Sequence, residues 1–160
     1  MDREQIIKEQ PLLAEKLKTV FDPEIPVYVE AESKKIGRIS LPGGLFDAMH
    51  ASPCLRIEVP MDIRVHGLLE DYQHYIDHPE QFIENLQPLH RFHGAKQLDH
   101  WNEMIRAGDF LTMVGELLTL HYDPSYSRAI TGHYVQLDNA TPLELDDLSE
   151  NSLKKIAATF

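Results

Sequence analysis

The sequence predicts an α/β fold, with a short parallel sheet followed by a mainly helical region. Two apolar, β-branched runs, at 27–30 and 54–59, have the length and composition of strands. Before the first run, apolar residues recur at helical spacing from Pro11 to Val20, and Pro11 suits a helix start. A helix that leads into a strand is typical of layered α/β proteins. We therefore expect both strands to lie in one parallel sheet.

A chain of 160 residues has the length of one domain, and a hydrophobic content of 42% is enough to form its core. We predict a single domain with an α/β part (1–60), a helical part (61–125) and a C-terminal extension (126–160). The chain is charged from Asp2 onward, and no apolar run approaches the ~18 residues of a membrane span. Its one cysteine, Cys54, excludes an internal disulfide and fits a reducing compartment. We expect a cytoplasmic protein without membrane association.

Between the two predicted strands the chain is charged and then helical. Residues 36–41 are interpreted as a loop or a short extended piece. Pro42 suits the first turn of a helix that ends near Ala51. The second strand then alternates apolar and charged residues, and Pro60 ends it.

From residue 61 to 122 apolar residues recur at helical spacing, which predicts four helices. Breaks are expected near 77–79, 92–94 and 107–109, where Pro or Gly occurs. Pro79 suits a helix start, and Asp109 is a candidate N-cap of the last of the four helices. Trp101 has helical spacing with other apolar residues and is expected in the core.

Further elements are predicted toward the C-terminus. The Asp123-Pro124 pair is expected to end the last of the four helices. Residues 132–137 are a candidate strand, and 151–159 a short helix capped by Ser149.

Charge limits the possible partners. A formal net charge of -11 argues against binding nucleic acid over the whole surface, because that binding depends on Lys and Arg neutralising phosphates. Local cationic patches remain possible. Lys34, Lys35 and Arg38 form one beside Gly37, where the backbone can approach a diphosphate closely, and Ser33 adds a hydroxyl. An anion site is expected here, with an ordinary solvated loop as the alternative.

Two carboxylates precede this patch. Glu30 and Glu32 are two positions apart, so in a strand they face the same side and could hold Mg²⁺ or orient a water. The alternative is a solvated strand end paired with neighbouring lysines. Arg64 is the candidate for an arginine that reaches phosphates from the helical region, and the alternative is a surface ion pair with Glu58 or Asp62.

The nine histidines suggest no metal site. His90 and His93, and likewise His74 and His78, have helix-face spacing, but no further cysteine or carboxylate completes a tetrahedral set. No metal is therefore assigned.

Several stretches together are similar to one family. They are VEAESKKIGR at 29–38, LP at 41–42, PCLRIEVP at 53–60, RV at 64–65, LLEDY at 68–72, GELL at 115–118 and HYDP at 121–124. The part of the chain from about Pro26 to about Tyr126 resembles the C-terminal part of bacterial tRNA 2-selenouridine synthase.

This resemblance implies an enzyme that replaces sulfur by selenium on the wobble 2-thiouridine of tRNA. Its implied substrates are selenophosphate and geranyl diphosphate, and its implied intermediate is geranylated. The family also carries a phosphate-binding loop and a rhodanese-like domain with a catalytic cysteine, upstream of the matched part. No Gly-x-x-x-x-Gly-Lys-Ser/Thr loop occurs in this sequence. The resemblance thus implies that this chain forms an incomplete P-loop-type layer. It also implies that the chain alone is inactive and binds no cofactor by itself.

The resemblance also implies where phosphate or tRNA would bind. The residues concerned are Glu30, Glu32, Ser33, Lys34, Lys35, Gly37, Arg38 and Arg64, while catalytic residues stay unassigned. Expected partners are tRNA in the complete enzyme and either a chain that supplies the N-terminal half or a second copy. The alternative from a different class is a non-catalytic α/β module that binds tRNA or protein. A small kinase or phosphatase is disfavoured by the missing loop.

Overall fold

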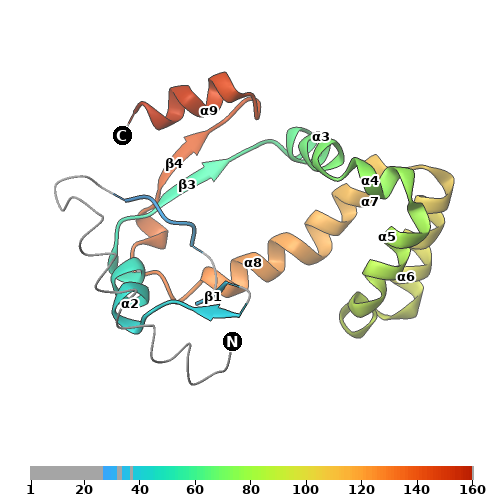
Figure 1. Ribbon diagram of the computed structural model, residues 1–160, viewed down its shortest axis with the longest axis horizontal. Coiled ribbons are helices and arrows are strands. Elements are labelled where there is room, and N and C mark those ends of the chain that lie inside the picture. Colours follow the sequence, from blue (N-terminus) through green and yellow to red (C-terminus); the bar gives the residue numbers. More distant parts are fainter. Residues whose placement is uncertain (1–26, 32–33, 37, 160) are drawn as a thin grey trace. The chain divides into compact units, whose positions relative to one another are not determined.

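The computed structural model describes residues 27–31, 34–36 and 38–159. They fall into two compact units. The first contains the described residues up to Leu55 together with Tyr126–Thr141, and the second contains Arg56–Ser125 and Pro142–Phe160. The ribbon in Figure 1 labels the elements of both. The helix expected at 11–20 lies outside the described residues.

The segment 27–31 is not a strand. No backbone ladder within the described part of the chain includes it. Val27, Tyr28 and Val29 are 50%, 59% and 56% exposed. The prediction of a strand at 27–30 is therefore wrong for this structure. β-Branched residues favour extended backbone, but a strand forms only where a second strand supplies hydrogen-bond partners.

A short hairpin and a helix follow in the first unit. Strands β1 (Lys35–Ile36) and β2 (Ile39–Ser40) pair antiparallel. This confirms a short extended piece within 36–41. Helix α2 (Gly43–Ala51) follows Pro42, as predicted.

The second predicted strand is present as β3 (Leu55–Glu58), but its partner is β4 (Thr141–Glu144). Thr141 N donates to Cys54 O at 3.0 Å, and Leu145 N donates to Glu58 O at 2.9 Å. Because the offset between donor and acceptor is the same at both ends, the strands are parallel. They appear in Figure 1 as adjacent arrows with one direction. The predicted parallel sheet is therefore present, but β3 pairs with β4 and not with residues 27–30.

Residues 132–137 form turns instead of the predicted strand. Gly132 has a φ of +82°, the left-handed region that glycine favours, and the 3₁₀-helix η3 (Leu137–Asn139) begins soon after. The strand comes a few residues later as β4. β4 was not predicted because it contains Pro142, and a proline within a run argues against a strand.

Most of the described chain is helical. The elements are α3 (Met61–Asp71), α4 (Gln73–Asp77), α5 (Pro79–Leu86), η1 (Gln87–Leu89), α6 (His90–Ala107), α7 (Phe110–Leu117), η2 (Leu118–Tyr122), α8 (Asp123–Ile130) and α9 (Glu150–Ala157). With its small parallel sheet, this content is compatible with an α/β fold. No described helix combines the length and apolarity that crossing a membrane requires.

The predicted helix ends are largely confirmed. Pro79 occupies the first position of α5. Asp109 caps α7 by accepting a hydrogen bond from Thr112 N at 3.3 Å, and Ser149 caps α9 in the same way. Gly94 has a φ of +76° inside α6, so the break expected at 92–94 is a kink within one helical run.

The helix does not end at Asp123-Pro124, contrary to the prediction. Instead, η2 is a π-helix in which Asp123 N donates to Leu118 O, and α8 continues to Ile130. In a regular α-helix, proline lacks the N–H donor and its ring collides with the carbonyl four residues earlier. A wider π turn just before Pro124 accommodates both defects.

The core of the helical unit lies between α3, α5, α6 and α7. Its buried members are Val65, Ile83, Leu86, Leu98, Trp101, Ile105, Met113, Val114 and Leu118. Trp101 and Met113 have no exposed surface, which confirms the core position predicted for Trp101.

Candidate functional site

The predicted cations lie together on the hairpin of the first unit. Lys35 pairs with Ser40 across the two strands, and Leu41 N donates to Lys34 O at 2.8 Å. The side chains of Lys34, Lys35 and Arg38 are exposed. Lys34 Nζ lies 5.7 Å from the ring centroid of Phe46 in α2, within cation–π distance. The short hairpin therefore presents three cations to solvent.

The other residues predicted for this site are less defined. Glu30 is exposed at the end of 27–31. Glu32, Ser33 and Gly37 lie outside the described residues. Among the residues that are described, no group of three or more His, Cys, Asp or Glu side chains could hold a metal ion.

Arg64 lies in the helical unit and is held by a carboxylate. Its Nη1 and Nη2 atoms donate to Asp123 Oδ2 and Oδ1 at 2.9 Å and 2.6 Å, a bidentate pair. The hydrogen bond to Asp123 raises the pKa of Arg64 above its ordinary value, although burial acts in the opposite direction. The sequence suggested Glu58 or Asp62 as ion-pair partner, and neither is correct. Glu58 binds Arg56 instead.

The ion pair leaves part of the guanidinium available. Arginine has five N–H donors, and Asp123 uses two of them. The Arg64 side chain keeps 29% of its surface exposed. Arg64 can therefore donate to an anion without first releasing Asp123.

Arg64 borders a cavity of about 550 Å³ in the helical unit. The lining is mainly apolar and comes from α3, α4, α5, η1, α7 and η2, with Leu148 from the C-terminal segment. The apolar and aromatic lining residues include Leu68, Leu69, Tyr72, Tyr75, Ile76, Phe82, Leu89, Phe110, Val114, Leu117 and Leu118. Pockets of ~300–1,000 Å³ are typical for small molecules.

Gly67 and Leu148 meet at the wall of this cavity. A Cβ atom on residue 67 would come within 2.7 Å of Leu148 Cδ1. A side chain at position 67 would therefore require the end of the flexible Leu148 side chain to shift. The cavity was not predicted from the sequence, because its lining residues come from segments distant in the chain.

A histidine pair lies beside the cavity. His93 Nε2 and His121 Nδ1 are 3.0 Å apart, and the rings meet edge to face. His121 also lines the cavity. The helix-face pairs considered from the sequence, such as His90 with His93, are not the pair that forms, since His93 contacts a histidine 28 positions away.

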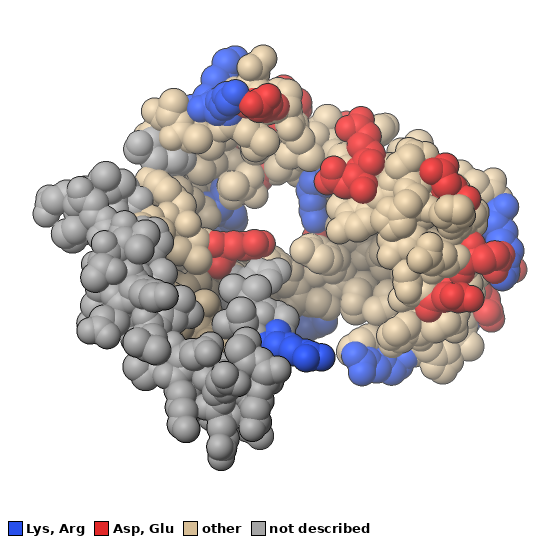
Figure 2. All heavy atoms as spheres, viewed as in Figure 1, with Lys and Arg blue, Asp and Glu red and all other residues tan. Residues whose placement is uncertain are grey.

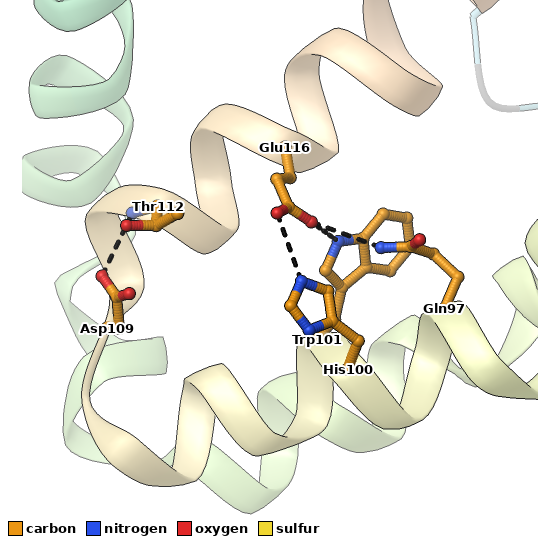
Figure 3. A network of polar contacts seen from close by, with 6 residues as sticks. All are labelled: Gln97, His100, Trp101, Asp109, Thr112 and Glu116. Carbon is orange, nitrogen blue, oxygen red and sulfur yellow. Dashed lines mark hydrogen bonds and ion pairs between the residues drawn. The ribbon is translucent and has the colours of Figure 1, made fainter.

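A second polar cluster joins α6 to α7 and was not predicted. Figure 3 shows three α6 side chains pointing at the carboxylate of Glu116. Trp101 Nε1 donates to it at 3.0 Å, Gln97 Nε2 at 3.3 Å, and His100 Nε2 lies 3.2 Å away. Burial pushes the pKa of Glu116 upward, but the hydrogen bonds from His100, Trp101 and Gln97 and the charge of His100 outweigh burial and lower it. These hydrogen bonds connect α6 to α7. The residues of the cluster are distant in the sequence from the hairpin cations.

The surface of the helical unit carries both signs of charge. On the face shown in Figure 2, acidic and basic side chains are interspersed over the part formed by α4 to α6. Arg106 of α6 pairs with Glu80 of α5 at 3.1 Å. Such a mixed surface provides no continuous positive field for nucleic acid on that face.

Comparison with known proteins gives one family. Residues 1–107 match the family described as "tRNA 2-selenouridine synthase AAA domain". A tRNA 2-selenouridine synthase of Shewanella loihica is 28% identical over 152 residues, covering 79% of this chain and 41% of the relative. One from Shewanella oneidensis is 25% identical over 182 residues, covering 94% and 48%.

A shorter match is closer in sequence. A tRNA 2-selenouridine synthase of Aeromonas salmonicida is 41% identical over 66 residues, which cover 41% of this chain and 18% of the relative. The chain thus spans less than half the length of each of these relatives. No solved structure gives a significant match.

Proposed function

The chain belongs to the tRNA 2-selenouridine synthase family, and we propose that it is part of an enzyme that replaces sulfur by selenium on the wobble 2-thiouridine of tRNA. The substrates would be selenophosphate and geranyl diphosphate, and the intermediate would be geranylated. The match over residues 1–107 supports the family reaction. The observation that supports the geranyl step is the apolar cavity bordered by Arg64.

The cavity suits the hydrocarbon part of geranyl diphosphate. Its lining is mainly apolar, and each CH₂ group moved from water into such a site contributes roughly 0.8 kcal/mol. Arg64 can donate to the diphosphate from the cavity rim. In the transfer, the thiouridine sulfur would bond to the first carbon of the geranyl chain while the bond to the diphosphate oxygen breaks. The diphosphate leaves with the electron pair, and a nearby guanidinium stabilises the charge that develops.

We expect Leu117→Gln to weaken the binding of geranyl diphosphate by at least ~10-fold, because it places an unpaired amide in an apolar cavity. The affinity for inorganic diphosphate should stay the same, since only the hydrocarbon contact changes. Leu111→Gln is the matched control. Leu111 is on the same helix but 51% exposed and does not line the cavity. Titration calorimetry with both ligands measures the effect.

Two results would contradict this site. One is equal affinity of the unmodified chain for geranyl diphosphate and for inorganic diphosphate. The other is an equal effect of the two leucine substitutions. Circular dichroism of each variant shows whether the helices are retained.

The hairpin cations are proposed to contact phosphate groups of tRNA. With a net charge of -11 the chain needs a local positive patch for this, and Lys34, Lys35 and Arg38 supply one. Glu30, Glu32, Ser33 and Gly37 are proposed to flank the same site. The P-loop character of the sheet and the need for further segments are also part of this proposal.

Replacing Lys34, Lys35 and Arg38 together by alanine should abolish the weak binding of tRNA. In the unmodified chain this binding should fall as salt rises, because exposed charges are screened over about 8 Å at physiological ionic strength. Filter binding at several salt concentrations measures both effects. Lys154→Ala with Lys155→Ala is the control, since it removes an adjacent lysine pair from α9. If that control weakens binding as strongly, the hairpin is not the site.

A further inference from the structure

The sheet of β3 and β4 has two outer edges, and they differ. Backbone N–H and C=O groups point alternately to the two sides of a strand. Thr141 and Leu145 donate to β3, so Pro142 and Glu144 direct their backbone away from it. Pro142 has no N–H and cannot donate to another strand. The outer edge of β4 is therefore blocked at its centre.

The outer edge of β3 has no such block. Cys54 O and Glu58 O accept hydrogen bonds from β4, so the N–H groups of Leu55 and Ile57 point to the opposite side. The side chains of Leu55 and Ile57 are 38% and 60% exposed. Parallel strands are normally covered on both faces and paired along both sides. A parallel strand with exposed apolar side chains is therefore an incomplete part of a sheet.

The opposite face of β3 is polar. Arg56 and Glu58 lie on it and form an ion pair at 2.6 Å. The exposure of Leu55 and Ile57 is thus limited to one face and one edge. A strand paired along this edge would accept hydrogen bonds from the N–H groups of these two residues, and its own side chains would lie beside Leu55 and Ile57 on the same face.

We propose that the outer edge of β3 binds a further β-strand that runs parallel to it. The strand would come from a segment that the longer relatives carry outside the stretch matched here, since this chain spans less than half of their length. A parallel orientation extends the existing β3–β4 pairing as a purely parallel sheet. The inference rests on the proposed need for further segments, but not on the reaction, so its test needs no activity.

The test joins the unmatched portion of the Shewanella loihica relative to the start of this chain through a flexible linker. The linker gives an effective concentration near millimolar, so a real site would be occupied. The amide protons of Leu55 and Ile57 should then exchange at least ~10-fold more slowly than in the chain alone. Hydrogen exchange followed by NMR measures each amide separately.

Two proline substitutions separate the edges. Ile57→Pro removes an N–H from the outer edge of β3 and should abolish the protection of Leu55. Glu144→Pro makes the same change on the outer edge of β4 and should leave the protection intact. Neither N–H belongs to the β3–β4 ladder, so both variants should fold. The fluorescence of the buried Trp101 checks this.

Three results would overturn the inference. The first is unchanged exchange at Leu55 and Ile57 in the fused protein. The second is equal loss of protection in the two proline variants. The third is protection in the chain alone at concentrations where light scattering shows a dimer, because the edge would then bind a second copy.

Discussion

The purified 160-residue chain should transfer no selenium to 2-thiouridine tRNA, with or without geranyl diphosphate. It contains no Gly-x-x-x-x-Gly-Lys-Ser/Thr loop, whose backbone N–H groups would hold phosphates. Its one cysteine, Cys54, is half-buried and lies just before β3. We expect no measurable ATP or GTP binding for the same reason. Mass spectrometry of the tRNA nucleosides measures the transfer.

The fused protein described above provides the positive control. If the unmatched portion of the relative supplies the missing groups, fusion should restore selenium transfer while the chain alone stays inactive. Turnover by the chain alone at the rate of a full-length relative would contradict the proposal that further segments are required. Strand pairing at β3 without restored turnover would retain the edge site and refute only the assigned reaction.

The sequence predicted local features of the fold well. Helix starts and ends depend on nearby residues, and Pro79, Asp109 and Ser149 all have the roles that their positions indicated. The composition of β3 was also sufficient to identify it as a strand. Such features need only a few neighbouring residues, so the sequence shows them directly.

The failures concern partners that are distant in the chain. The segment 27–30 has a strand-like composition, but a strand depends on a neighbour, and the sequence does not show whether one is present. β4 was missed because Pro142 is compatible with a strand only at an edge, and edge position is a property of the whole sheet. The π-helix before Pro124 was missed because proline normally ends a helix.

In the candidate site, too, the sequence predicted the groups that are close in the chain and missed the contacts between distant residues. The cations of the hairpin are adjacent in the sequence and were identified from it. Arg64 and Asp123 both lie in stretches that resemble the family, but their bidentate pairing joins positions 59 apart. Glu116 belongs to another of those stretches, and only the packing of α6 on α7 brings it to Trp101.

Trp101→Ala should destabilise the helical unit by about 3–5 kcal/mol, because it leaves a cavity where a fully buried side chain was. It also removes the indole donor to Glu116, whose carboxylate then loses one of its hydrogen bonds. Urea unfolding followed by circular dichroism at pH 7 measures the loss. Phe92→Ala is the matched control, since Phe92 is an aromatic residue on the same helix but 59% exposed. It should cost less than about 1 kcal/mol.

The pH dependence of stability tests the other half of this cluster. Folding lowers the pKa of Glu116, so its ionised form stabilises the folded state above the ordinary glutamate pKa of about 4.3. That contribution is lost as pH falls through the lowered value. Glu116→Gln should therefore reduce the free energy of unfolding at pH 7, with a smaller difference from the unmodified chain at about pH 3. Glu103→Gln, at an exposed position on α6, should show neither effect. A Glu116→Gln deficit that is the same at both pH values would show that the carboxylate charge does not contribute to the stability of the α6–α7 contact.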